Sequence, residues 1–200
     1  MRSIFYPVLV FLVMVAWGVL HSWLASFATK RLARQIFGKR LTRYYRLMFV
    51  AVAILTISPV LAMVVFLPAK VLWMIPSPWM YLTLSVQLLA IVGLLVTISH
   101  VDVMAFVGLR QLSNPDIESQ NELVITGWYQ VIRHPLYFFS ILILWLMPLM
   151  TDLILGFVIA STLYFLIGTI PEEKKLIQIY GQQYQEYQEK VPRIIPGIRF

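Results

Sequence analysis

The sequence predicts an all-α integral membrane protein with about five transmembrane helices and a cytoplasmic helix near its C-terminal end. Of the 200 residues, 60% are hydrophobic and only 12% are charged, which is too little charge to cover the surface of a soluble domain. Several uncharged runs also reach the roughly 20 apolar residues that a helix needs to cross about 30 Å of hydrocarbon. We therefore expect residues 1–200 to form a single transmembrane domain.

The apolar runs predict where these helices lie. Runs at 5–28, 47–67 and 79–99 contain no Asp, Glu, Lys or Arg and are long enough to span the bilayer. A fourth run at 136–150 is short for a span, and a turn at Pro148 separates it from a fifth run at 152–170. The last two runs are expected to form a tight helical hairpin, and whether the fourth crosses fully stays open.

Basic residues predict the orientation of the chain in the membrane. The loop after the first run holds seven Lys and Arg residues and no acid, a pattern typical of a cytoplasmic loop. Five crossings then place the basic residues of 101–133 and 171–200 on the same side, with only Arg2 and Lys70 outside. We expect an outside N-terminus, a cytoplasmic C-terminus and no nucleic-acid partner, because the net charge of +7 lies between apolar runs rather than on a solvated face.

The C-terminal segment 171–200 is the second of two polar stretches on the predicted cytoplasmic side. Pro171, followed by Glu172 and Glu173, predicts a helix that starts at the proline, because acids suit the positive end of a helix dipole. Apolar and aromatic residues then recur at helical spacing and end before Pro192: Leu176, Tyr180, Tyr184, Tyr187 and Val191. This stripe is expected to cover the 101–133 stretch or the membrane surface, and function is expected where the two polar stretches meet.

The segment 123–137 is the densest group of polar and aromatic residues. Gly127 predicts a sharp turn, and Pro135 predicts the start of the fourth helix, so Arg133 and His134 are placed at the membrane boundary. Interfacial residues of this kind also anchor helices without any other role, and both interpretations stay open. Asp102 near the hydrocarbon edge needs a partner, and Arg110 is the nearest basic candidate.

Motifs of soluble cofactor and metal sites do not occur in the chain. The nine glycines never form G-x-G, and neither G-x-x-x-x-G-K nor H-E-x-x-H is present. Three scattered histidines and no cysteine make a metal site improbable. One of them, His21 in the first run, is interpreted as an intramembrane polar residue whose hydrogen bonds are satisfied.

Two ordered motifs nevertheless resemble a known family. Leu-Val-x-x-Gly-x-Tyr-x-x-x-Arg-His-Pro-x-Tyr covers 123–137, and it is followed by Glu172-Glu173, Tyr180-Gly-Gln-Gln-Tyr-Gln-Glu-Tyr187 and Val191-Pro192. This pattern, in roughly the C-terminal half, resembles the isoprenylcysteine carboxyl methyltransferase superfamily, which includes phospholipid and membrane thiol methyltransferases. His21-Ser22-Trp23-Leu24, Arg43-Tyr-Tyr-Arg46 and Gly108-Leu109-Arg110-Gln111 are more similar to the thiol (methanethiol) S-methyltransferase branch.

The resemblance implies that S-adenosyl-L-methionine is bound on the cytoplasmic side and leaves as S-adenosyl-L-homocysteine. Aromatic faces attract a sulfonium cation, and a carboxylate accepts hydrogen bonds from an ammonium or ribose hydroxyls, so the residue types suit this donor. Carried over by position, the resemblance implies ten cofactor-binding residues: Asn121, Glu122, Leu123, Val124, Tyr129, His134, Pro135, Leu136, Tyr137 and Glu172.

The chain departs from the isoprenylcysteine enzymes at one position. In those enzymes an arginine shortly before the acidic pair is expected to hold the carboxylate of the acceptor, whereas Gly168 stands there in this sequence. Candidates for positioning the acceptor are then Arg110, Arg133 and Arg193, and no residue is assigned proton transfer. The departure favours methyl transfer to a lipophilic or small thiol.

Three alternatives to a thiol methyltransferase stay open at this point. Two are enzymatic: carboxyl O-methylation of an isoprenylcysteine and N-methylation of a phospholipid. The third is a non-enzymatic membrane protein in which Arg133 and His134 only anchor a helix. The identity of the methyl acceptor and the oligomeric state stay open as well.

Overall fold

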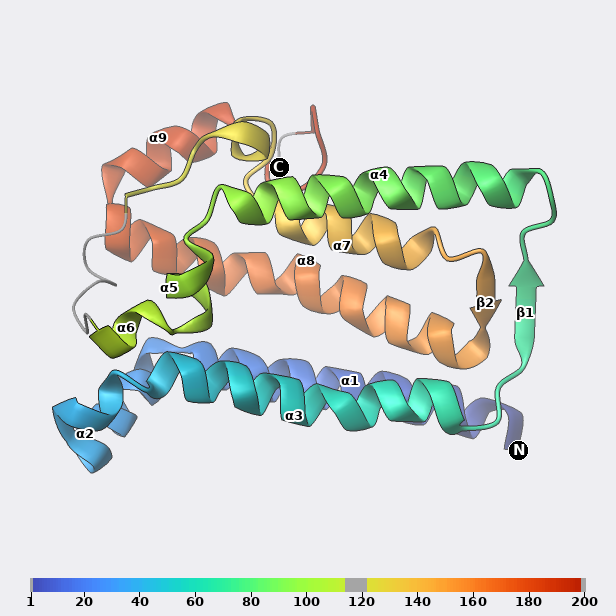
Figure 1. Ribbon diagram of the computed structural model, residues 1–200, viewed down its shortest axis with the longest axis horizontal. Helices are drawn as coiled ribbons and strands as arrows, with labels where there is room; N and C mark the ends of the chain where they lie inside the picture. Colours follow the sequence, from blue (N-terminus) through green and yellow to red (C-terminus); the bar gives the residue numbers. More distant parts are fainter. Residues whose placement is uncertain (1, 114–121, 199–200) are drawn as a thin grey trace.

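The computed structural model describes residues 2–113 and 122–198, and these form a helical bundle (Figure 1). The predicted fold class is confirmed by four helices in the described residues that are long and apolar enough to cross a membrane. They are α1 (Arg2–Ala25), α3 (Tyr45–Phe66), α4 (Trp79–Ser99) and α8 (Asp152–Tyr180). In Figure 1, α1 and α3 run along one side of α8, and α4 runs along the other.

The predicted fourth span is only a short helix. α7 (Pro135–Trp145) has 11 residues and is therefore about 16 Å long, roughly half the hydrocarbon thickness. α7 and α8 (Asp152–Tyr180) pack against each other as the predicted hairpin does, but the connection between them contains β2 (Leu149–Thr151), which pairs antiparallel with β1 (Val71–Met74). Asp152 strengthens this pairing, since its carboxylate accepts a hydrogen bond from the backbone N–H of Lys70. Such pairing between distant segments has no local sequence signal.

The bundle has two different ends. The helices α2 (Phe27–Thr42), α5 (Val103–Val107), α6 (Arg110–Ser113) and α9 (Gln182–Lys190) lie at one end, which we call the polar end (Figure 1). The N-terminus and the β1–β2 ribbon lie at the other end. The basic loop and the two polar stretches thus share one end, as the orientation prediction requires. That this end lies on the cytoplasmic side of the membrane stays a prediction.

The predicted helix start at Pro171 is wrong. α8 runs without interruption from Asp152 through Pro171 to Tyr180, and it is capped at its start by Thr151, whose hydroxyl accepts from the N–H of Ile154. A proline removes one backbone hydrogen bond from a helix but does not always end it. The break comes ten residues later at Gly181, which has a φ of 57° and separates α8 from α9.

The first predicted span also ends earlier than expected. α1 stops at Ala25, and Ser26 caps the next helix because its hydroxyl accepts from the N–H of Thr29. Residues 27–28 therefore belong to α2, which carries basic residues of the first loop. α2 lies at the polar end, beside the start of α3 and the end of α1.

Gly108 gives a first prediction about the packing of the polar end. It follows α5 with a φ of 100°, and a Cβ there would lie 2.6 Å from the backbone nitrogen of Leu47. Gly108→Ala is expected to cost about 1–2 kcal/mol in backbone strain and more from a clash that no side-chain rotation relieves. Gly197→Ala is the control, since its φ of 79° is also positive but nothing lies within 4 Å of the added Cβ. A similar fall in thermal unfolding midpoint for both detergent-purified variants would contradict the tight α3–α5 contact.

Candidate functional site

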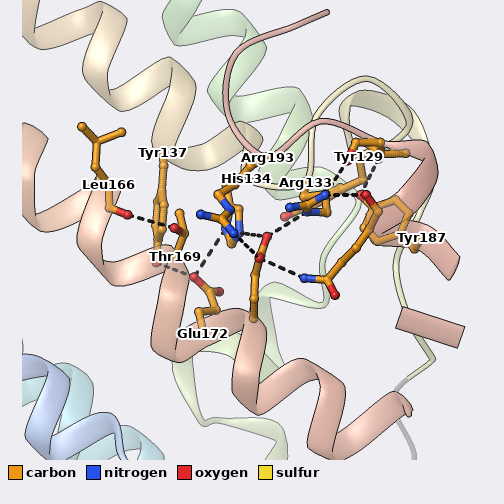
Figure 2. Close-up of polar contacts among 12 residues, drawn as sticks. Tyr129, Arg133, His134, Tyr137, Leu166, Thr169, Glu172, Tyr187 and Arg193 are labelled. Atoms are coloured by element: carbon orange, nitrogen blue, oxygen red, sulfur yellow. Dashed lines mark hydrogen bonds and ion pairs between the residues drawn. The ribbon is translucent and has the colours of Figure 1, made fainter. Parts of the chain in front are cut away.

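Glu173 of α8 is buried and is the centre of a polar network, whose members Arg133, His134 and Arg193 are labelled in Figure 2. Its Oε1 accepts a hydrogen bond from Nε of Arg133 at 2.8 Å and lies 3.2 Å from Nε2 of His134. Its Oε2 accepts from the amide of Gln188 at 2.9 Å and lies 3.2 Å from Nη2 of Arg193. Four donors from three parts of the chain therefore converge on one carboxylate, which satisfies the charge that burial would otherwise make costly.

Arg133 connects the start of α7 to the C-terminal segment. The residue is only 7% exposed, and its Nη1 donates to the backbone carbonyls of Gln188 at 2.8 Å and Val191 at 2.6 Å. The backbone N–H groups of Arg133 and His134 donate to the carbonyls of Pro192 and Arg193. An arginine that snorkels to the membrane surface would point outward, so Arg133 is not an anchor of that kind. The side chain points inward and holds two segments together.

A cavity of about 590 Å³ adjoins this network at the polar end. Its walls come from the start of α3, the end of α4, α5, α6, the 122–134 segment, the last turns of α8, and α9. The lining combines three kinds of side chain: the acids Asp102, Glu122 and Glu172; the bases Arg46 and Arg133; and the phenols Tyr129, Tyr180, Tyr184 and Tyr187. The cavity wall thus combines charged groups of both signs with aromatic rings and apolar side chains.

The structure brings together most of the residues proposed for the cofactor. Six of the ten line the cavity: Glu122, Leu123, Val124, Tyr129, His134 and Glu172. Pro135, Leu136 and Tyr137 lie in the first turn of α7 behind the wall, and Asn121 falls outside the described residues. Tyr137 still reaches the site, because its hydroxyl donates to Oε2 of Glu172 at 2.6 Å.

The two adjacent glutamates have different surroundings. The side chain of Glu173 is 5% exposed and saturated with donors, whereas that of Glu172 is 43% exposed and lines the cavity. The imidazole of His134 lies between them, with Nδ1 3.6 Å from Oε2 of Glu172 and Nε2 facing Glu173. It also stacks on the ring of Tyr137 at 5.3 Å. One carboxylate, that of Glu173, therefore holds the site together, and the other, that of Glu172, lines the cavity.

The tyrosine stripe forms one wall of the cavity. Tyr184, Tyr187 and Val191 are buried and pack against Leu123, which confirms that the stripe covers the 101–133 stretch. The hydroxyl of Tyr187 donates to the backbone carbonyl of Tyr129. Burial, and then the Glu172 carboxylate, raise the pKa of Tyr129 to about 12, and burial also raises the pKa of Tyr184 and Tyr187. These phenols are therefore neutral near pH 7 and present uncharged rings.

The three arginines proposed to position an acceptor are engaged elsewhere. Arg133 and Arg193 both pair with Glu173, and Arg110 pairs with Asp102, for which it was the nearest basic candidate in the sequence. Of the three, only Arg133 lines the cavity.

Sequence reasoning missed the role of Arg46 and the central position of Glu173. Arg46 begins the first turn of α3, lines the cavity and donates from Nε to the carbonyl of Phe106 at 2.7 Å. That contact joins residues 60 positions apart, so only the Arg43-Tyr-Tyr-Arg46 motif could have indicated it. The sequence feature that could have indicated the position of Glu173 was the acidic pair Glu172-Glu173.

A comparison with known families agrees with this site. The model of the phospholipid methyltransferase family matches residues 80–183, just over half of the chain. The chain belongs to this family. The matched part contains α4, α7, α8 and most of the cavity wall, including the Arg133–Glu173 pair. The C-terminal segment that this pair holds in place lies beyond the family match.

Several relatives of this phospholipid methyltransferase family member are named as methyltransferases. A methanethiol S-methyltransferase of Pseudomonas deceptionensis is 42% identical over 71 residues, which is 36% of this chain and 27% of the relative. A methanethiol S-methyltransferase of Crocosphaera subtropica is 42% identical over 72 residues, which is 36% of this chain and 28% of the relative. A protein-S-isoprenylcysteine O-methyltransferase of Dictyostelium discoideum is 38% identical over 82 residues, which is 38% of this chain and 33% of the relative. The matches thus span about a quarter to a third of each relative, and no solved structure gives a significant match.

Proposed function

We propose that the chain is an S-adenosyl-L-methionine-dependent methyltransferase that methylates a small or lipophilic thiol at the polar end of its bundle. The observation that carries this proposal is the cavity of about 590 Å³ that Glu172 lines together with Tyr129 and His134, inside the segment matched by the family. We further propose that this end faces the cytoplasm, as the basic residues of the first loop indicate.

The residues present fit the proposed methyl donor. The cavity volume lies within the roughly 300–1,000 Å³ of small-molecule sites. Glu122 and Glu172 are suited to accept hydrogen bonds from an ammonium group and from ribose hydroxyls. Neutral tyrosine rings are suited to cover an adenine and a sulfonium. When bound, this donor supplies a methyl group on a positively charged sulfur.

The protein contributes mainly by positioning and by excluding water. The Glu173 network holds the 122–134 wall against the C-terminal segment, so the groups that face the cavity are fixed relative to one another. Fixed geometry of two reactants supplies much of the rate in an in-line transfer. Attack of a thiolate on a sulfonium also removes charge, and such a step gains from apolar surroundings such as Leu123, Val124 and Leu176.

The structure favours a thiol over a carboxylate as the acceptor. A carboxylate acceptor needs a cation available to it near the acidic pair, but Gly168 stands at the position of the family arginine, and the two arginines beside the pair, Arg133 and Arg193, are bonded to Glu173. The methanethiol enzymes among the relatives agree with this choice. Isoprenylcysteine O-methylation is the second candidate, favoured by the relative from Dictyostelium discoideum.

The deciding experiment measures binding and turnover with the full chain purified in detergent. Isothermal titration should detect S-adenosyl-L-homocysteine binding, and label from a methyl-labelled donor should pass to methanethiol in preference to a prenylcysteine or a phospholipid amine. Folded protein that binds no S-adenosyl-L-homocysteine would refute the methyltransferase proposal. A preference for the prenylcysteine or the amine would refute only the choice of thiol.

A further inference from the structure

A second cavity, of about 220 Å³, lies between α1, α2 and α3 and shares no lining residue with the candidate site. Seven residues line it: Leu24 of α1, Ala33 and Phe37 of α2, and Tyr45, Met48, Phe49 and Val52 of α3. The hydroxyl of Tyr45 donates to the backbone carbonyl of Leu24, so the one polar side chain of the wall is already satisfied. Such a wall suits an apolar ligand.

This second cavity lies where the membrane-spanning helices meet the polar end (Figure 1). Leu24 is the last residue but one of α1, and the lining residues of α3 lie within its first eight residues, about 10 Å along the helix axis. Met48 and Val52 are exposed on the surface of the bundle. Because they belong to a spanning helix, this surface meets hydrocarbon. The second cavity is therefore within reach of a lipid acyl chain.

Phe49 lies between this cavity and two residues outside it. Its ring centroid is 4.8 Å from that of His21 in α1 and 5.9 Å from the guanidinium carbon of Arg46, which lines the candidate site. Nδ1 of His21 is buried and has no hydrogen-bond partner in the part of the chain that the structure describes, so the sequence interpretation of a histidine with satisfied hydrogen bonds is wrong. The two cavities are thus adjacent but have separate walls.

Two basic residues of α2 border the second cavity. Lys30 precedes Ala33 by three positions, and Arg34 precedes Phe37 by three. Residues three apart are neighbours on a helix surface, so Lys30 and Arg34 form a row, which we call the basic row, beside the two α2 residues that line the cavity. α2 is regular through this part, since its dihedral angles depart from helical values only at Gly38.

α2 as a whole has the composition of a helix that lies in the membrane interface. Leu32, Ile36 and Phe37 are exposed apolar residues, and the segment 27–46 contains seven Lys and Arg residues and no acid. Helices of this kind place their apolar side chains in the hydrocarbon and their cations near anionic lipid headgroups. The polar neighbour of the second cavity is therefore a region of positive charge.

We propose that the second cavity binds an acyl chain of an anionic phospholipid whose phosphate pairs with the basic row. The apolar wall by itself would also suit the tail of a methyl acceptor, but the charge beside it favours a ligand that joins an apolar chain to a negative headgroup. This site does not depend on the proposed function, because none of its residues lines the candidate site.

The first test measures lipid binding to the full chain in detergent by native mass spectrometry. Wild type should bind phosphatidylglycerol at least about tenfold more tightly than phosphatidylcholine with the same acyl chains. In Lys30→Gln/Arg34→Gln the affinity for phosphatidylglycerol should fall about ten- to thirtyfold, because each cation near an anionic lipid contributes about a factor of five. Equal affinity of wild type for the two lipids would overturn the proposal.

Arg31→Gln/Lys174→Gln is the matched control for the loss of two charges. Both residues are exposed, Arg31 lies on α2 two positions from Ala33 and so on another side of the helix, and Lys174 lies on α8. This variant should keep its affinity for phosphatidylglycerol within about threefold of wild type. An equal loss in both double variants would show a general attraction to the basic surface and would overturn the assignment to the basic row.

The second test fills the cavity. Ala33→Phe from α2 and Val52→Trp from α3 each place a larger side chain in it, and both should weaken the binding of the two lipids at least about tenfold. Leu32→Phe makes a similar change at an exposed position of α2 and should bind as wild type does. Thermal unfolding without lipid identifies a filling variant that is merely misfolded, in which case the other one decides. Unchanged binding in a folded filling variant, or displacement of phosphatidylglycerol by a long-chain thiol, would refute the lipid site.

Discussion

Glu173→Gln is expected to lower the free energy of unfolding by about 3–5 kcal/mol. The change leaves Arg133, whose side chain is 4% exposed, without its buried counter-charge, and removing one partner of a buried ion pair has this order of cost. The new amide NH₂ also faces side chains that can only donate at this point, the Arg133 and Arg193 guanidinium groups. Chemical or thermal unfolding in detergent, followed by circular dichroism, measures the effect.

Glu172→Gln is the matched control for this prediction. It makes the same chemical change one residue earlier, but that side chain is 43% exposed and keeps an oxygen for the hydroxyl of Tyr137. We expect it to cost no more than about 1 kcal/mol. Equal stability losses for the two variants would show that Glu173 is not the centre of the C-terminal attachment.

Glu172→Gln should instead weaken the affinity for S-adenosyl-L-homocysteine about ten- to hundredfold. Hydrogen bonds to charged groups contribute about 1.5–3 kcal/mol, and each 1.4 kcal/mol is a factor of ten in Kd. Glu172 is the acidic residue of the pair that lines the cavity, so its charge is available to the ammonium or ribose of the ligand. Isothermal titration with the purified variant measures the change.

Glu189→Gln controls for the loss of a negative charge at the same end of the molecule. Glu189 is exposed on α9 and does not line the cavity, so its variant should bind as wild type does. Unchanged affinity in Glu172→Gln would leave Tyr137 as the only described hydrogen-bonding partner of this carboxylate and would remove it from the ligand site.

Several features of the fold could be predicted because they depend on local composition. The spans at 47–67 and 79–99 match α3 and α4 within two residues, since a long uncharged apolar run has no other stable place than a membrane helix. Pro135 begins α7 as predicted, because its fixed φ suits a first helical turn. The continuation of α8 through Pro171 to a break at Gly181 was not predicted, because that part of the helix contacts residues distant in the sequence, with Glu173 bonded to Arg133 and Glu172 to Tyr137.

Local sequence features were enough to predict the membrane environment of this protein, most of its helices, and the residues around 122–137 and 172 that form the candidate site. These features can be predicted because hydropathy, charge and turn preference depend on residues that are neighbours in the sequence. Tertiary contacts, in contrast, bury Glu173 rather than Glu172 and bring Arg46 of α3 to the cavity. These properties depend on contacts between side chains that are distant in the sequence. Such contacts are determined by the geometry of helix packing and not by local propensity.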